Sequence, residues 1–403
     1  MNREKRLELK KVEPKHLQQF NQLLRYVFQV TNSNLHEVGW KEPEIASAKL
    51  PVLEQAHVLG WFDKDKLVSQ AAVYPFQVRI FNKTFEMGGV TGVGTYPEYA
   101  NMGLMAKLLY KALVDMRERG QSVSYLFPYS IPYYRRKGWE IISDKMTFEV
   151  KDFQLPKMKT VSGEVERIEP EHEIIKEVYS RFAHKSHAAM IRNELAWDEY
   201  WRWDLEELTA AVYYDQSRQA NGYVLYWIAD EVFHIKEMVY VNEEARRGLW
   251  NFISAHFSMV TKVVGDNYSN EPIAFLLEDA EIEETISPYF MARIVDIEQF
   301  INQYPFKPQK EKRTWSFTLE DPLLEWNQGV FTAEISPEGK AVLSPGGDPD
   351  AAKLDIQTMT ALLFAYRKPE YLHRTGRLEC SPDTLEFIED LLETQTPYFS
   401  DYF

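Results

Sequence analysis

The chain has 403 residues, a formal net charge of −15 and a single cysteine, Cys380. This length exceeds one ordinary domain core and predicts two or three domains. The acidic balance argues against a nucleic-acid partner, and one cysteine excludes an internal disulfide and a cysteine-based metal cluster. A charge of this sign would attract a cationic substrate, but acidity is more often a device for solubility.

The hydrophobic fraction of 45% and the aromatic fraction of 14% are those of a folded globular protein. The opening residues, MNREKRLELKK, are charged and have no apolar run behind them. No later stretch approaches the roughly 20 apolar residues of a membrane helix. We therefore expect a cytoplasmic protein with no membrane partner.

The first part of the chain combines strands with one amphipathic helix, whose first turn Pro14 suits. Its apolar spacing predicts a strand over 6–12, a helix that ends near Phe28, and a meander of strands over 57–62, 67–80 and from 83 toward Val90. The meander leads directly into the central stretch of the sequence.

Residues 90–120 are the stretch around which the chain is organised. Alternating small and β-branched residues predict a strand that stops at Pro97, because proline cannot donate to a strand ladder. Apolar residues then recur at helical spacing from Asn101 until Gly120, a natural C-terminal cap. The turn between strand and helix aims backbone N–H groups and the positive helix end at one spot, which suits a phosphate. Most α/β domains contain such a unit, so the signal is weak alone.

Two further strands are predicted after this helix, one over 122–128 and a closing strand that ends near Val150. Between them lies PYYRRKGWEII at 132–142, which carries Tyr133, Tyr134 and a basic run. The basic run is either a solvated surface or a contact for phosphate groups.

An internal echo indicates two copies of one fold. KKVEPKH at 10–16 is matched by ERIEPEH at 166–172, and Gly248 aligns with Gly103 between a strand and an amphipathic helix. Two glutamates precede Gly248 and put negative charge where phosphates would sit. We therefore expect the second copy to be structural, with the join near 156–162.

The last part of the chain predicts a mixture of sheet and helix. Its pattern favours strands over 314–319, 329–335 and 341–343, and helices over 356–364 and 382–392. The segment SPGGDPD could be mistaken for a phosphate loop, but its aspartates favour a surface turn.

The turn before the central helix resembles the acyl-coenzyme A binding motif of the GNAT acetyltransferases, whose usual form is Arg/Gln-x-x-Gly-x-Gly/Ala. The matching positions in this chain are Ala100, Asn101, Met102, Gly103, Leu104 and Met105. Only Gly103 fits the strict pattern. Backbone amides make most of such contacts, so the departures bear on the affinity for the cofactor more than on its identity.

The whole chain resembles the enhanced intracellular survival (Eis) family, and the resemblance includes ARIVDIEQF from Ala292 and the aromatic C-terminus. It implies an α+β fold with mixed sheets, built from tandem GNAT domains and a sterol-carrier-like domain. The domains implied are a catalytic GNAT domain over 1–155, a structural GNAT domain over 156–292, and the sterol-carrier-like domain over 293–403.

The same resemblance implies an N-acetyltransferase with acetyl-CoA as donor. The implied acceptor is a primary amine of a cationic small molecule, of aminoglycoside or polyamine type, or of a lysine. We expect acetyl-CoA to bind through Val93, Gly94, Thr95 and residues 100–105. The histidines show no zinc spacing, so we expect no metal, and we expect a homo-oligomer whose size the sequence leaves open.

Tyr134 matches the family tyrosine that donates a proton to the leaving thiolate. A phenol with a pKa near ~10 is protonated at neutral pH and can act in this way. The alternative is that Tyr134, like Tyr133, is only a core aromatic residue.

The resemblance also implies that the carboxylate of the chain end, here Phe403, accepts a proton in the cleft of the first domain. Its ordinary pKa of ~3.5 makes it a weak base, so we interpret it as an anchor and as a proton acceptor after attack. A disordered tail is the alternative, but Tyr398, Phe399, Tyr402 and Phe403 are costly to leave in water.

Two other functions compete with acetyl transfer. One is a non-enzymatic carrier or sensor of lipid or acyl-CoA that uses the C-terminal domain. The other is a GNAT-like aminoacyl transferase that uses charged tRNA, which conflicts with the acidic charge balance.

Overall fold

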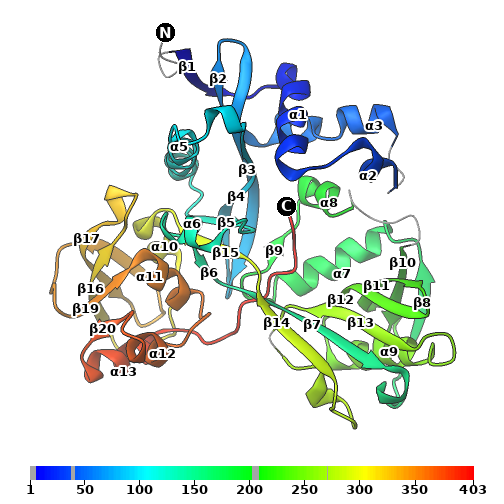
Figure 1. The fold of residues 1–403 in the computed structure, drawn as a ribbon. Coiled ribbons are helices and arrows are strands. Elements are labelled where there is room, and N and C mark those ends of the chain that lie inside the picture. The colour runs from blue at the N-terminus through cyan, green and yellow to red at the C-terminus, as the bar shows by residue number, and fades with distance from the viewer. Residues whose placement is uncertain (1–5, 38–40, 202–207, 270) are drawn as a thin grey trace.

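The computed structural model describes residues 6–37, 41–201, 208–269 and 271–403. Three sheets, of eight, seven and five strands, carry helices on their faces (Figure 1). This mixed α and β architecture confirms the predicted fold class. Within the described ranges, no helix combines the length and the apolar character that crossing a membrane requires.

The first sheet contains the predicted meander and the central stretch. Its order is β1-β2-β3-β4-β5-β15-β6, with β9 beside β3. The strands are β1 (Leu7–Lys11), β2 (His57–Asp63), β3 (Lys66–Ile80), β4 (Lys83–Thr95), β5 (Val123–Leu126), β6 (Glu140–Ile141), β9 (Met190–Ile191) and β15 (Met291–Ile294).

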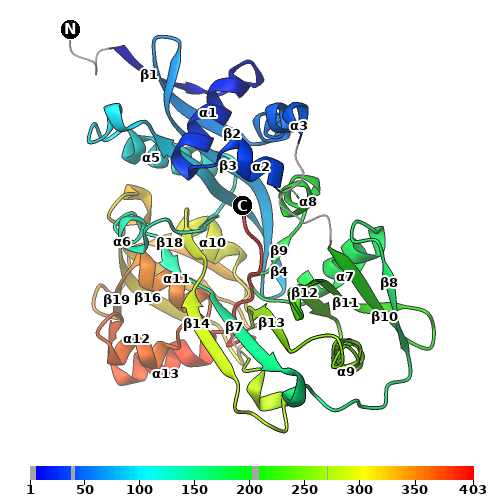
Figure 2. The ribbon, with the colours of Figure 1, turned by 45° about the vertical axis from the view of Figure 1, so that its right-hand side comes forward.

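Helices cover both faces of the first sheet (Figures 1 and 2). Helix α1 (Leu17–Phe28) packs on one face and α5 (Leu104–Glu118) on the other. Alternate residues of β3 therefore enter different cores, with Tyr74 on the α1 side and Val73 on the α5 side. The predictions for α1, for the end of β4 before Pro97 and for α5 are confirmed.

Short helices connect the remaining parts of this region. They are α2 (Asn32–Glu37), α3 (Glu42–Ser47), α4 (Leu50–Gln55), α6 (Ile131–Arg135) and the 3₁₀ turn η3 (Pro97–Tyr99). Helix α6 follows β5 and begins with a proline in its first turn.

The second sheet follows the order β14-β7-β13-β12-β11-β10-β8, with α7 (Glu173–Ala183) and α9 (Glu243–Ser254) packed against its strands. Helix α8 (Glu194–Trp201) reaches from this unit toward α4. The strands are β7 (Asp144–Lys151), β8 (Glu164–Ile168), β10 (Thr209–Tyr214), β11 (Ala220–Ala229), β12 (Val232–Tyr240), β13 (Lys262–Asn267) and β14 (Glu283–Pro288).

The first and second sheets exchange strands. The expected closing strand of the first copy, β7, pairs with β13 and β14 of the second sheet. In return, β15 lies between β5 and β6 of the first sheet. The sequence did not predict this exchange, because strand pairing across sheets leaves no local pattern. The division into 1–155, 156–292 and 293–403 stays a prediction.

The alignment of Gly248 with Gly103 is wrong as a local equivalence. Gly103 caps the N-terminus of α5 with a φ of 69°, whereas Gly248 lies inside α9. A Cβ atom at Gly248 would come within 2.3 Å of the Tyr213 ring. Gly248 therefore allows close packing of α9 on the sheet, and Asn242 caps the start of α9 instead.

The third sheet has the order β18-β17-β16-β19-β20, with helices packed around it (Figure 1). The predicted strands and the two predicted helices are present. The elements are α10 (Ile297–Gln303), β16 (Arg313–Glu320), β17 (Gly329–Ile335), β18 (Ala341–Pro345), β19 (Ala352–Asp355), α11 (Ile356–Leu363), α12 (Pro369–Arg374), β20 (Glu379–Cys380) and α13 (Pro382–Leu391).

The chain end leaves α13 and runs back between the other two units (Figures 1 and 2). It finishes beside the first sheet, near β3, β4 and α8. Residues far apart in the sequence are thereby brought to one place.

Candidate active site

The site lies where two parallel strands of the first sheet separate. Strands β4 and β5 pair only from Met87 to Gly89, and β4 then continues to Thr95 while β5 ends at Leu126. A cavity of about 1010 Å³ opens at this point. Its lining residues are Asn21, Leu24, Arg25, Val27, Phe28, Val30, Leu35, Ala48, Lys49, Val90, Thr91, Gly92, Val93, Gly94, Thr95, Met105, Phe127, Tyr129, Tyr133, Tyr134, Glu199, Tyr402 and Phe403.

A β-bulge interrupts β4 at the wall of this cavity. Gln70 of β3 pairs with Gly94 and Ala72 pairs with Thr91, so two residues of β4 stand opposite one of β3. The first of these two is Gly92, with a φ of 59° that glycine adopts without strain. The bulge frees backbone groups from the ladder beside the cavity. The sequence analysis missed it, because VTGVGT continues the regular strand pattern.

The predicted cofactor residues fall into two groups. Val93, Gly94, Thr95 and Met105 line the cavity. Residues 100–103 form the turn before α5, in which Asn101 and Gly103 both have positive φ, and Leu104 is the first residue of the helix. The amide of Ala100 donates to the Pro97 carbonyl, and the Leu104 side chain is buried against Val68 and Tyr99. These two residues shape the turn.

The turn residues present fit the phosphates of a coenzyme A group. A Cβ atom added at Gly103 would meet nothing within 4 Å, so the N-terminus of α5 is open there. An open helix N-terminus presents backbone N–H groups and a partial positive charge to an anion. The side chains contribute less, since Ala100 and Met102 carry no charge.

Tyr134 lies in the cavity wall and is 4% exposed. Helix α6 positions it, and its ring packs at near right angles to those of Tyr133 and Trp139, with centroids 5.2 Å and 6.0 Å away. Burial, and secondarily the neighbouring Tyr133, raises the pKa of Tyr134 to about 12. The phenol therefore holds its proton at neutral pH, as a proton donor must.

Phe403 also lines the cavity and is 9% exposed. Its ring lies 5.2 Å from that of Phe76 and 5.3 Å from that of Phe290. A Cβ atom at Gly89 would come within 2.8 Å of this ring, so Gly89 makes room for the chain end where β4 and β5 separate. The structure thus brings Tyr134 and Phe403 to one cavity.

Of the aromatic tail residues expected to be sheltered from water, Phe399 and Phe403 are buried and Tyr402 is not. Tyr402, although costly to leave in water, is 54% exposed, and its ring centroid lies 5.1 Å from that of Phe127. Phe399 is fully buried, 4.4 Å from the Phe290 ring. The alternation of an extended chain explains the difference, since Phe399, Asp401 and Phe403 share the inward side.

The second sheet's unit supplies one polar wall of the cavity. Glu199 of α8 pairs with Lys49, which precedes α4, at 2.7 Å, and both line the cavity. The sequence analysis did not identify either residue, because neither stands in a motif. Much of the remaining wall is apolar and comes from Leu24, Val27 and Phe28 of α1.

The basic run after Tyr134 is partly engaged within the protein. Arg135 pairs with the buried carboxylate of Glu140 at 2.7 Å. The Lys137 ammonium lies 3.9 Å from the centre of the Tyr133 ring. These contacts hold α6 and its tyrosines in place, and the expected contact with phosphates stays a prediction.

Comparison with protein families divides the chain into three matched regions. Residues 8–142 match the acetyltransferase (GNAT) domain, and residues 188–294 match a second acetyltransferase (GNAT) domain. Residues 297–400 match the sterol carrier protein domain. An uncharacterized N-acetyltransferase of Streptomyces avermitilis is 22% identical over 387 residues, which cover 87% of this chain and 90% of that protein.

Solved structures share the whole architecture. A probable N-acyltransferase of unknown function from Enterococcus faecalis is 29% identical, with a TM-score of 0.90, and covers 98% of this chain and 99% of its own. Eis1 from Mycobacterium abscessus is 18% identical, with a TM-score of 0.81, and covers 98% of this chain and 100% of its own. At that identity, the likeness to Eis1 establishes the fold.

Proposed function

Because the chain is a GNAT-type acetyltransferase with two GNAT domains and a sterol carrier protein domain, we propose that it transfers the acetyl group of acetyl-CoA to a primary amine. The observation that carries this proposal is the convergence of Tyr134 and Phe403 on one cavity beside the β4 bulge. We propose that the thioester binds in this cavity, which a proton donor and a potential proton acceptor both line.

The proposed reaction has a simple proton balance. The lone pair of a neutral amine attacks the thioester carbonyl carbon, and a C–N bond forms. The C–S bond then breaks, and the departing thiolate takes the phenolic proton of Tyr134. The new ammonium loses one proton, and this proton passes through a proton acceptor and solvent to the Tyr134 phenolate, so no net proton remains on the enzyme.

We propose that the carboxylate of Phe403 takes up the ammonium proton. A carboxylate cannot deprotonate an ammonium ion with a pKa near ~10 efficiently, but it accepts a proton readily from the far more acidic adduct formed after attack. The ring of Phe403 lies between those of Phe76 and Phe290, which holds the residue that bears this carboxylate in place.

Acetyl-CoA is proposed to bind the first GNAT domain only. The bulge in β4 and the open N-terminus of α5 support this placement. At the corresponding helix of the second domain, Asn242 caps the N-terminus and Glu244 accepts from the Ser162 amide at 2.7 Å. A phosphate would have to displace both side chains.

The acceptor is proposed to carry its amine on a largely apolar body. Among the described lining residues, Glu199 alone carries a side-chain carboxylate, and it is already paired with Lys49. An aminoglycoside or polyamine brings several positive charges, whose desolvation needs several carboxylates. Of the acceptor classes expected from the sequence, a lysine amine within an apolar segment matches this wall best.

The alternative of a lipid or acyl-CoA carrier gains no support from this cavity. Of the residues beyond 296, only Tyr402 and Phe403 line it. A carrier would bind its ligand in the third sheet's unit, where the strands and helices surround a packed core.

The deciding experiment measures coenzyme A release from acetyl-CoA across aminoglycosides, polyamines and lysine peptides with apolar or polar flanks. We expect turnover with lysine peptides, faster with apolar flanks. A rise in melting temperature with acetyl-CoA but not with fatty acids would agree. Stabilisation by fatty acids, with no release from any amine, would favour the carrier.

A further inference from the structure

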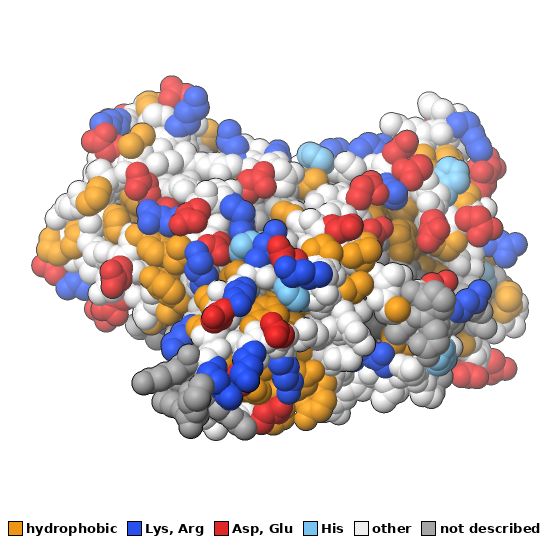
Figure 3. All heavy atoms as spheres, turned by 90° about the horizontal axis from the view of Figure 1, so that it is seen from above, with side chains coloured by type: hydrophobic (Ala, Val, Ile, Leu, Met, Phe, Trp, Pro, Cys, Tyr) orange, Lys and Arg blue, Asp and Glu red, His pale blue; other side chains and the backbone are white. Residues whose placement is uncertain are grey.

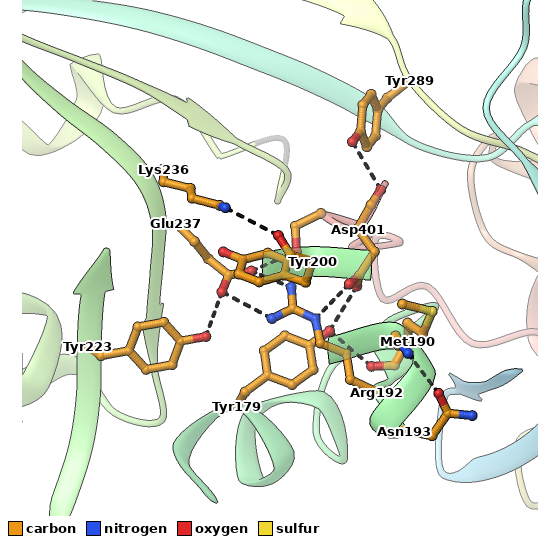
Figure 4. Close-up of polar contacts among 12 residues, drawn as sticks. Tyr179, Met190, Arg192, Asn193, Tyr200, Tyr223, Lys236, Glu237, Tyr289 and Asp401 are labelled. Atoms are coloured by element: carbon orange, nitrogen blue, oxygen red, sulfur yellow. Dashed lines mark hydrogen bonds and ion pairs between the residues drawn. The ribbon is translucent and has the colours of Figure 1, made fainter. Parts of the chain in front are cut away.

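The last residues of the chain follow a path fixed by the second sheet's unit. The Tyr398 amide donates to the His187 carbonyl at 2.8 Å, and the Tyr289 hydroxyl donates to the Asp401 carbonyl at 3.0 Å. Phe399 is fully buried between them. Figure 4 shows the Tyr289 hydroxyl pointing at the backbone of Asp401.

A buried ion cluster grips the side chain of Asp401 (Figure 4). Arg192 donates from Nε to Asp401 at 2.6 Å, and its two terminal nitrogens reach Glu237 at 2.6 Å and 3.3 Å. The Tyr223 hydroxyl donates to Glu237 at 2.6 Å. The Tyr179 hydroxyl lies 3.0 Å from the Asp401 carboxylate. The Arg192 side chain is wholly buried, and both carboxylates are nearly so.

Arg192 is itself held rigidly. Its guanidinium lies 3.7 Å from the ring centre of Tyr179, 4.1 Å from that of Tyr200 and 4.6 Å from that of Trp197. It also follows directly after β9, which pairs with β3 of the first sheet. Strand β3 pairs with β4, which forms part of the cavity wall. The position of Arg192 is therefore fixed relative to the cavity through β9 and β3.

This cluster is a costly way to hold two units together. Three charges leave water to form it, and apolar packing commonly holds an interface as well as a buried ion pair. What an ionic fork adds is a defined position. Two residues, Tyr402 and Phe403, follow Asp401, and two residues span at most roughly 7 Å. A fixed Asp401 therefore restricts where the Phe403 carboxylate can lie.

We propose that the second GNAT domain is part of the catalytic apparatus, because Arg192, through Asp401, sets the position of the Phe403 carboxylate in the cavity of the first. Arg192 is a positioning residue in this account. The inference rests on the proposed function, in which that carboxylate accepts a proton. It assigns work to a domain that the sequence analysis took as structural.

The kinetic test compares two arginines, each paired through Nε with a buried carboxylate at 2.6 Å. Arg192 pairs with Asp401, and Arg117 pairs with Asp296, away from the tail. We expect Arg192→Leu to lower kcat by about 10²-fold while leaving KM for acetyl-CoA unchanged. Arg117→Leu removes the partner of one buried carboxylate rather than two, and is expected to keep kcat. Equal losses of kcat in both variants would overturn the proposal.

Asp401→Asn provides a second variant that folds more readily, since Arg192 keeps its pair with Glu237. Each variant is also made with one glycine added after Phe403, which moves the carboxylate by roughly 3.3 Å. If Arg192 acts through that carboxylate, the added glycine lowers kcat in the unsubstituted protein. In Arg192→Leu and Asp401→Asn the added glycine then causes no further loss of kcat. Losses that multiply would overturn the proposal.

A digestion experiment tests, without any acetyl transfer, whether the pair of Arg192 with Asp401 holds the tail in place; we call this pair the clamp. Carboxypeptidase removes a C-terminal phenylalanine only when the tail leaves its site, so its rate follows the population of the released tail. We expect Arg192→Leu to release Phe403 faster by about 10²-fold, and Arg117→Leu to release it at the unsubstituted rate. An unchanged rate in Arg192→Leu would overturn the clamp. Absence of turnover in the unsubstituted protein would instead overturn the proposed function.

Discussion

Each GNAT domain has a helix that follows a central strand, α5 after β4 in the first and α9 after β12 in the second. The two helices begin differently. The N-cap residue of α5 is Gly103, which has no side chain and leaves the helix end open. Helix α9 starts at Asn242, whose side chain accepts from the Ala245 amide at 2.8 Å. The N-cap residue therefore decides the difference. With glycine the backbone N–H groups of the helix end can receive an anion, and with asparagine a side chain already accepts a hydrogen bond from one of them.

A glycine at each helix provides the sharpest way to break this comparison. We expect Gly103→Asp to abolish acetyl-CoA binding, because a carboxylate would stand where phosphate oxygens approach and the positive φ would be strained. The measurement is the dissociation constant by calorimetry, with an expected loss of at least about 10²-fold.

Gly248→Ala is its control in the second domain. The new methyl would collide with the Tyr213 ring, so we expect the free energy of unfolding to fall by about 1–3 kcal/mol. The affinity for acetyl-CoA should not change. Weakened binding in Gly248→Ala, or full binding in Gly103→Asp, would contradict the proposal that acetyl-CoA binds the first domain.

The next largest effect concerns chemistry rather than binding. Tyr134→Phe should lower kcat by about 10²-fold and leave the affinity for acetyl-CoA nearly unchanged, since only the hydroxyl is lost. Tyr133→Phe, the neighbouring change, should be mild. Turnover of Tyr134→Phe at the unsubstituted rate would show that another group protonates the thiolate.

The junction between the domains should respond to acid. His187 is fully buried, accepts from the Phe81 amide and lies 2.9 Å from the Phe364 carbonyl, and burial lowers its pKa to about 4. Between this value and the ordinary ~6.5, the unfolded chain binds the extra proton, so stability falls as the pH falls through that window.

We expect the free energy of unfolding to drop by about 2 kcal/mol from about pH 7 to about pH 5 through this residue. Chemical denaturation at both pH values measures it. His187→Phe does not titrate, so it should lose this component whatever its absolute stability. An identical pH dependence in the variant would exclude His187 as the source.

The smallest effect tests the capped helix directly. Asn242→Ala removes the cap of α9 and should lower the free energy of unfolding by about 1 kcal/mol. Acetyl-CoA affinity and kcat should stay as they were. A second binding event in this variant, seen by calorimetry, would show that the cap is what keeps the second domain from binding the cofactor.

Local signals were sufficient for much of the fold. Helix α1 ends at Phe28 and β4 stops before Pro97, as apolar periodicity and the proline predicted. Tyr134 and Phe403 were proposed from the resemblance, and they lie at one cavity. Each of these predictions depended on neighbours in the sequence or on a whole-chain likeness.

The missing parts depended on contacts between distant residues. Arg192 and Asp401 are 209 residues apart in the sequence, and nothing in the sequence around either one indicates the other. The exchange of β7 and β15 is equally invisible, since each reads as an ordinary strand. The glycine alignment failed because one residue type serves two physical needs, a positive φ at Gly103 and close packing at Gly248.

The strand exchange also bears on how the protein is made. During synthesis β5 emerges long before its neighbour β15, and β6 reaches the first sheet only through β15. The nascent first domain therefore waits with an open edge until most of the second has left the ribosome. The second sheet can be completed before the first, since its last strand in the chain, β14, precedes β15. The chain end that we propose to take part in catalysis is made last of all.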